Sequence, residues 1–115
     1  MSKVDWCYHR KNCNSCDKTS AFLDQHGIPV KTQLDARTTP LVEADALQLV
    51  DKANELYVTR GTKVFHFNLK QERPDNETLL GFLIGRSGKL RAPTVQVGKT
   101  LIVGFDQSTY EHVLR

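Results

Sequence analysis

Residues 8–16 read YHRKNCNSC, a segment in which two residues separate Cys13 from Cys16. Residues 3–9 contain aromatic side chains and predict a short strand. The apolar spacing of residues 13–27 predicts a helix that ends at a glycine. A Cys-x-x-Cys motif at the junction of a strand and a helix is typical of thiol redox chemistry, so we predict a redox site at these two cysteines.

The predicted helix places Cys13 at or near its N-terminus, where unpaired backbone N–H groups and the helix dipole favour an anion. The thiolate is the nucleophilic form of cysteine, so this position favours reactivity. His9, Arg10 and Lys11 add positive charge, and no acidic residue lies between His9 and Cys16. We expect Cys13 to be the nucleophile and Cys16 to resolve the mixed disulfide. His9 either stabilises the thiolate as a cation or is a polar strand end.

Two alternatives use the same cysteines differently. In the first, they are ordinary small buried residues. In the second, they belong to a tetrahedral zinc site, because four potential ligands lie within ten residues: Cys7, His9, Cys13 and Cys16. Cys7 and His9 would come from the interior of the predicted strand, beside the aromatic side chains of Trp6 and Tyr8. We therefore expect Cys7 to be a buried core residue and predict no metal site.

The composition of the chain is that of a globular protein. It has 115 residues, of which 39% are hydrophobic and 25% charged, and we expect one domain over residues 1–115. The net charge of +3, with lysines and arginines scattered among acidic residues, does not predict direct nucleic-acid binding. We see no secretory signal and no apolar run near the roughly 20 residues of a membrane helix. We therefore expect no membrane association, and a cytoplasmic location in which cysteines stay reduced.

The remaining elements follow from apolar periodicity and turn residues. A strand–helix–strand unit implies a parallel pair, and a terminal hairpin adds antiparallel partners. The result is an α/β fold with a small mixed sheet and helices packed on it. We predict strands at residues 30–35, 64–69, 94–97 and 100–103, and helices at residues 43–56, 76–84 and 107–114.

Two terminal motifs resemble one known family. Residues 8–28, with the Cys-x-x-Cys and the following Phe22-Leu23, resemble the opening of the ArsC/Spx-like branch of the thioredoxin superfamily. Residues 91–110 resemble its end. The resemblance spans nearly the whole chain, with a shortened helical middle. It implies a thioredoxin-like fold, in which a four-stranded mixed sheet is flanked by helices and carries a short helical insertion.

A proline opens the first arm of the predicted hairpin. Such a proline lacks a ladder donor and therefore needs a reason to be there. In a thioredoxin-like sheet it is cis and faces the cysteine loop, so the residue before it presents backbone groups to an extended thiol substrate. A trans proline on an edge strand is the alternative, because cis is the minor X–Pro isomer. We assign four residues to substrate binding here: Arg91, Ala92, Pro93 and Thr94.

The arsenate reductases of the resembled family imply one set of roles. They use a single cysteine at the position of Cys13, a histidine matching His9, and three arginines that bind the oxyanion. Arg60 matches one of these arginines. The other two positions hold Ala92, with an arginine one place earlier, and Phe105. Losing two charge-assisted donors weakens oxyanion binding.

Cys16 instead agrees with two other groups in this superfamily. The Spx-type redox regulators carry a Cys-x-x-Cys switch and bind RNA polymerase. Glutaredoxin-like reductases share the motif and the cis-proline, and in them the segment matching residues 103–106 contributes to glutathione binding. This resemblance points to Gly104 and Asp106 as further binding residues.

Three functions are therefore open. The first, which we favour, is a thiol–disulfide oxidoreductase that uses Cys13 and Cys16, binds no cofactor and is recycled by glutathione or thioredoxin. The second is a redox-sensing transcriptional regulator with RNA polymerase as its partner. The third is an arsenate reductase that uses Cys13 alone.

Overall fold

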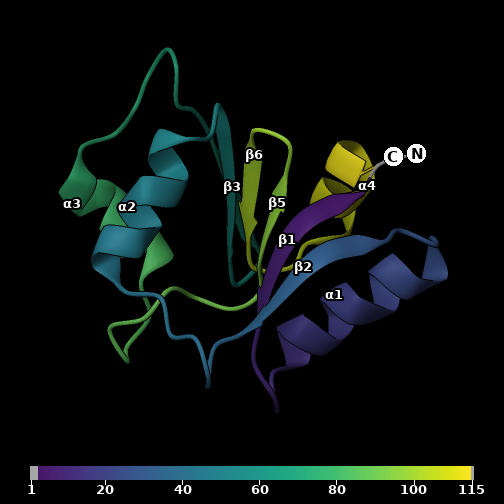
Figure 1. The fold of residues 1–115 in the computed structure, drawn as a ribbon. Helices are drawn as coiled ribbons and strands as arrows, with labels where there is room; N and C mark the ends of the chain where they lie inside the picture. The colour runs from purple at the N-terminus through teal and green to yellow at the C-terminus, as the bar shows by residue number, and fades with distance from the viewer. Residues whose placement is uncertain (1–2, 115) are drawn as a thin grey trace.

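The computed structural model describes residues 3–114. Six strands form one mixed sheet in the order β2-β1-β5-β6-β3-β4. Helices α1 and α4 cover one face of the sheet, and α2 and α3 cover the other (Figure 1). The elements are β1 (Val4–His9), α1 (Asn14–Gln25), β2 (Val30–Asp35), α2 (Glu43–Asp51), β3 (Glu55–Arg60), β4 (Lys63–Asn68), α3 (Asn76–Leu83), β5 (Thr94–Val97), β6 (Thr100–Val103) and α4 (Gln107–Leu114).

The pairing of the strands confirms the α/β architecture expected from the sequence. β1 runs parallel to β2 and antiparallel to β5. The β5–β6 hairpin has the bounds predicted from the sequence, and Val97 pairs with Thr100 next to its turn. β6 then runs parallel to β3, whose other neighbour is the antiparallel β4. The hairpin therefore joins two strand pairs into a single sheet.

The sheet has six strands, whereas the residue pattern predicted five and the family resemblance implied four. The predicted helix at residues 43–56 is too long. α2 ends at Asp51, and Glu55–Arg60 form β3 instead. Leu56 fits the apolar spacing of the helix, but it is fully buried on a strand between β6 and β4. A single apolar residue satisfies both periodicities, and only the pairing with β6, more than forty residues later, selects the strand.

Two buried clusters hold the helices on the sheet. The larger cluster lies under α2 and α3 and includes Leu56, Leu79 and Leu83. The smaller cluster lies under α1 and α4 and includes Phe22 and Tyr110. Tyr110 is fully buried, and its hydroxyl lies 3.2 Å from Thr19 Oγ1 and donates to the Gly104 carbonyl at 3.3 Å. This side chain therefore ties α4 to α1 and to the end of β6.

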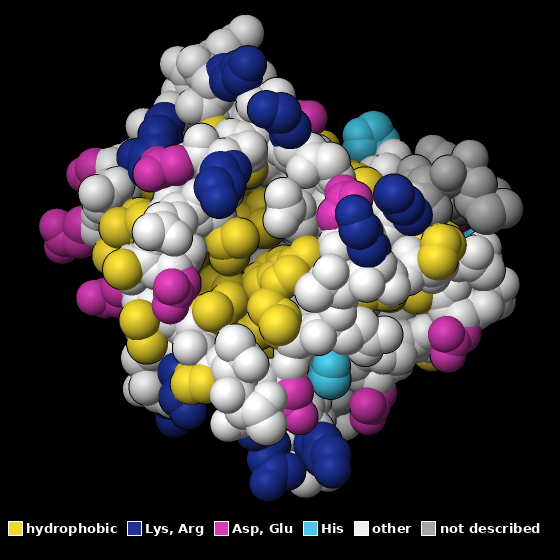
Figure 2. Space-filling view, viewed as in Figure 1, with side chains coloured by type: hydrophobic (Ala, Val, Ile, Leu, Met, Phe, Trp, Pro, Cys, Tyr) yellow, Lys and Arg dark blue, Asp and Glu magenta, His cyan; other side chains and the backbone are white. Residues whose placement is uncertain are grey.

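The face that carries α2 also has a hollow. This cavity of about 220 Å³ is lined by apolar residues, among them Trp6, Leu34 and Leu49, and by polar residues such as Asp45 and Gln48. Figure 2 shows hydrophobic side chains gathered in the middle of this face. None of the residues predicted to carry chemistry lines the hollow. Over residues 3–114, no helix is both long and apolar enough to cross a membrane.

Candidate thiol redox site

Cys13 is the N-cap residue of α1. Its backbone is extended (φ −122°, ψ 112°), and its sulfur accepts a hydrogen bond from the Cys16 backbone N–H at 3.2 Å. The sulfur occupies the position that a serine or aspartate oxygen takes in ordinary N-caps. The predicted placement of Cys13 at a helix N-terminus is therefore correct, and the positive end of the helix faces its sulfur.

The proline segment lies opposite this sulfur. The Ala92–Pro93 peptide bond is cis, and the Cys13 thiol lies 3.8 Å from the Ala92 carbonyl oxygen, to which it donates. Thr94 is fully buried, and its hydroxyl donates to the Arg91 carbonyl at 2.6 Å. Thr94 thus holds the backbone turn through which Ala92 reaches the cysteine. Ala92 was predicted to present backbone groups here, and the fold brings it beside Cys13.

Cys16 lies one turn further along α1 and is only 4% exposed. Burial raises the pKa of the Cys16 thiol to about 12, and a hydrogen bond to Cys13 acts in the same direction. Cys16 is therefore a neutral thiol at physiological pH, and neutral thiols are poor nucleophiles. Cys13 is also buried, at 6% exposed, but its sulfur is the one that accepts a backbone N–H at the start of α1, which suits a pair in which Cys13 attacks first and Cys16 acts second.

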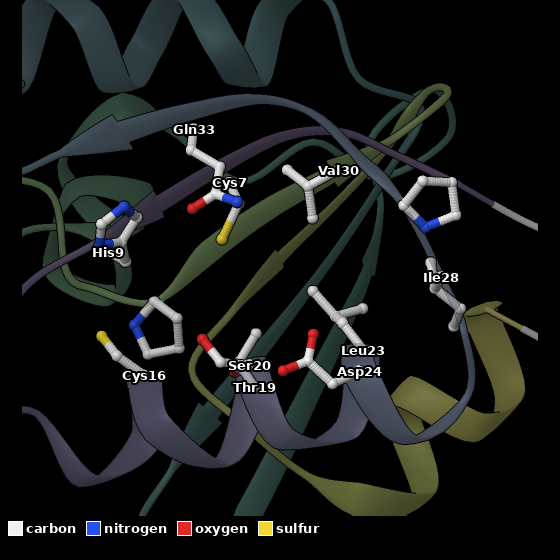
Figure 3. A pocket seen from close by; sticks show the side chains of 12 residues that line it. Cys7, His9, Cys16, Thr19, Ser20, Leu23, Asp24, Ile28, Val30 and Gln33 are labelled. Atoms are coloured by element: carbon white, nitrogen blue, oxygen red, sulfur yellow. The ribbon is translucent and has the colours of Figure 1, made fainter.

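Cys16 also lines a pocket of about 410 Å³ between α1 and the strands β1 and β2 (Figure 3). Its lining includes Cys7, His9, Cys16 and Pro93, but not Cys13. Cys7 is 6% exposed, as expected of a core residue, and burial raises its pKa to about 11. The pocket therefore gives space beside Cys7 and Cys16, whereas the sulfur of Cys13 faces the proline segment.

His9 ends β1 and lines this same pocket (Figure 3). Its backbone carbonyl accepts from the Ala36 N–H at 2.8 Å, which joins the ends of β1 and β2. Across residues 3–114, no hydrogen bond connects the His9 ring to Cys13 or Cys16. The role of His9 in stabilising a thiolate stays a prediction, and the interaction observed for His9 is the backbone bond that fits a strand end.

Arg60 and Arg91 lie together around Phe82. The Arg60 guanidinium stacks over the Phe82 ring at 5.5 Å from its centroid. Arg91 donates to the Thr59 carbonyl at 3.2 Å and to the Phe82 carbonyl at 3.4 Å. Burial lowers the pKa of Arg91, and the charge of Arg60 adds to this effect. The fold brings the two predicted arginines together. Through its two hydrogen bonds, the Arg91 guanidinium also joins β3 and α3 to the proline segment.

Gly104 and Asp106 both contribute to the structure around the site. The Gly104 N–H donates to the Pro93 carbonyl at 2.8 Å, directly behind the cis peptide. Asp106 caps α4, because its carboxylate accepts from the backbone N–H and the hydroxyl of Thr109, both at 2.9 Å. The two residues predicted from the resemblance to bind substrate therefore position the proline segment and start the last helix.

We expect the substitution Gly104→Ala to destabilise the protein by about 2–4 kcal/mol, because it adds a clash to backbone strain. Gly104 has φ +86°, and an added Cβ would lie 2.9 Å from the Thr59 carbonyl oxygen. Gly61→Ala is the matched control, since Gly61 has φ +61° and open space around it. It should cost about 1–2 kcal/mol for backbone strain alone. Urea unfolding of both variants tests this, and equal losses would contradict it.

One group of residues beside the site was missed from the sequence. Arg10, Arg37, Arg86 and Lys89 line a pocket of about 550 Å³ that also includes Ala92. They come from three separate segments, so the sequence has no contiguous cluster of charge that would predict them. Over residues 3–114, no group of three or more His, Cys, Asp and Glu side chains is arranged to hold a metal ion.

The comparisons with known proteins agree with this geometry. A model of the ArsC family matches residues 8–113. The chain belongs to the ArsC family. The fold predicted from the two terminal motifs is therefore confirmed, and the matched range includes the Cys-x-x-Cys, the proline segment and most of α4.

Two curated relatives of this ArsC-family protein are regulators. The chain is 30% identical over 112 residues to the "Global transcriptional regulator Spx" of Enterococcus faecalis (strain ATCC 700802 / V583), covering 93% of the chain and 83% of that protein. It is 28% identical over 102 residues to the "Regulatory protein MgsR" of Bacillus subtilis (strain 168), covering 86% and 81%. Among solved structures, the "YFFB (PA3664) protein" matches with a TM-score of 0.59 and 14% identity, covering 96% of this chain and 98% of that one. This last likeness concerns the fold alone.

Proposed function

We propose that this ArsC-family protein is a thiol–disulfide oxidoreductase in which Cys13 attacks the substrate and Cys16 resolves the intermediate. The observation that supports this most is the N-cap geometry. The Cys13 sulfur accepts the Cys16 backbone N–H at 3.2 Å, and that bond strengthens when the sulfur is an anion. Cys16 is held as a neutral thiol next to it. The two thiols thus differ in position, since the Cys13 sulfur lies at the helix N-terminus and Cys16 lies one turn inside the helix.

In the first step, the Cys13 thiolate attacks one sulfur of a substrate disulfide, and the other half leaves as a thiolate. Cys13 and the retained half then form a mixed disulfide. In the second step, Cys16 loses its proton to solvent and attacks the Cys13 sulfur, which releases the retained half as a second thiolate. The substrate gains two electrons, and the protein ends with a Cys13–Cys16 disulfide. Glutathione or thioredoxin, as the proposed reductant, returns the protein to the dithiol state.

The surrounding residues have supporting roles in this proposal. Ala92 supplies backbone groups along which an extended substrate lies, since its carbonyl is already 3.8 Å from the attacking sulfur. Pro93, Thr94 and Gly104 hold Ala92 in place. His9 lines the pocket beside Cys16, and Arg60 adds positive charge next to Arg91. The proposed compartment is the reducing cytoplasm, where the dithiol form is maintained.

A second candidate function uses the same pair of thiols as a switch. The relation to Spx and MgsR, both named as regulators and both matched over most of their length, favours a redox-responsive regulator. In this case, formation of the Cys13–Cys16 disulfide changes the binding of a protein partner, for which the family resemblance suggests RNA polymerase. Arsenate reduction has less support, because Ala92 and Phe105 stand at two of the three arginine positions.

Turnover separates the two candidates. The protein is mixed with a large excess of a disulfide peptide, with glutathione and glutathione reductase or with thioredoxin and its reductase, and NADPH oxidation is followed. An oxidoreductase consumes many equivalents of peptide per protein. A regulator is oxidised once and stops, and then its disulfide form should bind RNA polymerase differently from its dithiol form in a pulldown. Oxidation of NADPH that depends on arsenate, with no peptide present, would contradict both.

A further inference from the structure

Five basic side chains line one pocket, which we call the cationic pocket: Arg10, Arg37, Arg86, Lys89 and Arg91. Its volume is about 550 Å³. A smaller pocket next to it shares two of these arginines and adds Arg60. Six of the 16 lysines and arginines of the chain therefore gather in one region, although the net charge of the whole protein is only +3.

Three separate segments bring these charges together. In the cationic pocket, Arg10 follows β1 and Arg37 follows β2. Arg86, Lys89 and Arg91 lie in the connection between α3 and β5. β1 and β2 are parallel, so the segments after them leave the sheet at the same end (Figure 1). The connection before β5 is joined to this end by the Leu90 N–H, which donates to the Leu41 carbonyl at 2.7 Å. The pocket is therefore built by the fold.

No acidic residue neutralises the cationic pocket. Its lining contains no aspartate or glutamate. Within residues 3–114, the two ion pairs are Arg73 with Asp51 and His66 with Glu55, and neither involves the pocket. Unpaired charges of one sign held together repel one another and favour a ligand of opposite charge. The cationic pocket therefore fits a ligand that carries several negative charges.

The cationic pocket adjoins the thiol. Ala92 lines it, and the Ala92 carbonyl lies 3.8 Å from the Cys13 sulfur. We propose that the cationic pocket binds acidic side chains next to the disulfide of a protein substrate, and so selects which disulfides reach Cys13. This inference rests on the proposed exchange function and adds a substrate class to it.

Other polyanions fit the pocket less well. No aromatic side chain lines it, so it offers no platform on which a nucleic-acid base would stack. Its basic residues come from three separate segments of the chain, whereas a single oxyanion needs a compact set of donors. Apolar Ala36 and Leu90 lie among the charges and provide contacts for a peptide chain.

The test uses three peptides of equal length, each joined by a mixed disulfide to the same chromophoric thiol. Glutamates flank the cysteine in the first, glutamines in the second and lysines in the third. At low ionic strength, we expect kcat/KM for the acidic peptide to exceed that for the neutral peptide by about tenfold, and the advantage to fade in high salt. The double variant Arg86→Gln/Lys89→Gln should lose this advantage and keep the rate with the neutral peptide.

The control is the double variant Lys31→Gln/Lys70→Gln, which removes the same charge from exposed positions outside the pocket. It should keep the preference for the acidic peptide. Equal kcat/KM for acidic and neutral peptides, or an equal loss in both double variants, would overturn the proposal. The proposal would also be overturned if a DNA duplex bound more tightly than the acidic peptide and Arg86→Gln/Lys89→Gln abolished the DNA binding.

A binding measurement keeps the two proposals separate. A fluorescent acidic peptide with serine in place of cysteine reports occupancy of the cationic pocket by anisotropy, without any exchange. Tight binding that Arg86→Gln/Lys89→Gln weakens, together with no reaction of any disulfide at Cys13, would overturn the exchange function and support the pocket as an acidic-peptide site. Exchange with the neutral peptide, without binding of the acidic one, would overturn the pocket proposal alone.

Discussion

The substitution Cys13→Ser is expected to lower the rate of disulfide exchange by about a thousandfold or more, because it removes the attacking sulfur. The variant should remain folded. Serine is a favoured N-cap residue, so its hydroxyl can accept the Cys16 N–H that the sulfur now accepts at 3.2 Å. The measurement is the initial rate with a chromophoric disulfide, made beside a circular dichroism spectrum and an unfolding curve.

The control for this experiment is Cys7→Ala. Cys7 is buried like Cys13 and Cys16 but lies outside the Cys-x-x-Cys motif, and it packs in the cluster under α1 and α4. Its removal should cost stability and leave the exchange rate close to that of the native protein. If Cys13→Ser kept the native rate while Cys7→Ala abolished it, the nucleophile would be misassigned.

The substitution Cys16→Ser is expected to stop the reaction half-way. Cys13 still attacks, but no thiol remains one turn along α1 to release the bound half of the substrate. A covalent adduct of one substrate half per protein should therefore accumulate at Cys13, and multiple turnover should cease unless an external thiol resolves it. Intact mass spectrometry measures the adduct, and digestion locates it.

The double variant Cys13→Ser/Cys16→Ser is the control, and it should form no adduct at the site. The reverse result would be an adduct at Cys16 in the single variant Cys13→Ser, formed as fast as the adduct in Cys16→Ser. That result would contradict the assignment of roles, which depends on the position of the Cys13 sulfur at the N-terminus of α1.

The parts of the fold that local sequence determines were predicted well. The hairpin of β5 and β6 was found at its observed bounds, because β-branched residues fill both arms and Gly98 stands in the turn with φ +59°. α4 was also found at its observed bounds. β3 was missed because it is defined by a parallel partner far along the chain, and Leu56 alone fits helix and strand alike.

The same division between local and distant information applies to the site. The Cys-x-x-Cys and its place at a helix start are local, so they were visible in the sequence. The contact between Cys13 and Ala92 joins residues 79 positions apart, and only the family resemblance pointed to it. The cationic pocket had no such guide, since Arg10, Arg37 and Arg86 meet only when β1, β2 and the α3–β5 connection are folded together.

The proposed chemistry requires Cys13 and Cys16 to form a redox couple. The most direct measurement is to oxidise the reduced protein mildly, alkylate the remaining thiols, and map the cysteines by peptide mass spectrometry. We expect a disulfide between Cys13 and Cys16 with Cys7 alkylated after unfolding, and full reversal by glutathione or thioredoxin. A disulfide that includes Cys7, or three alkylated cysteines after oxidation, would contradict it.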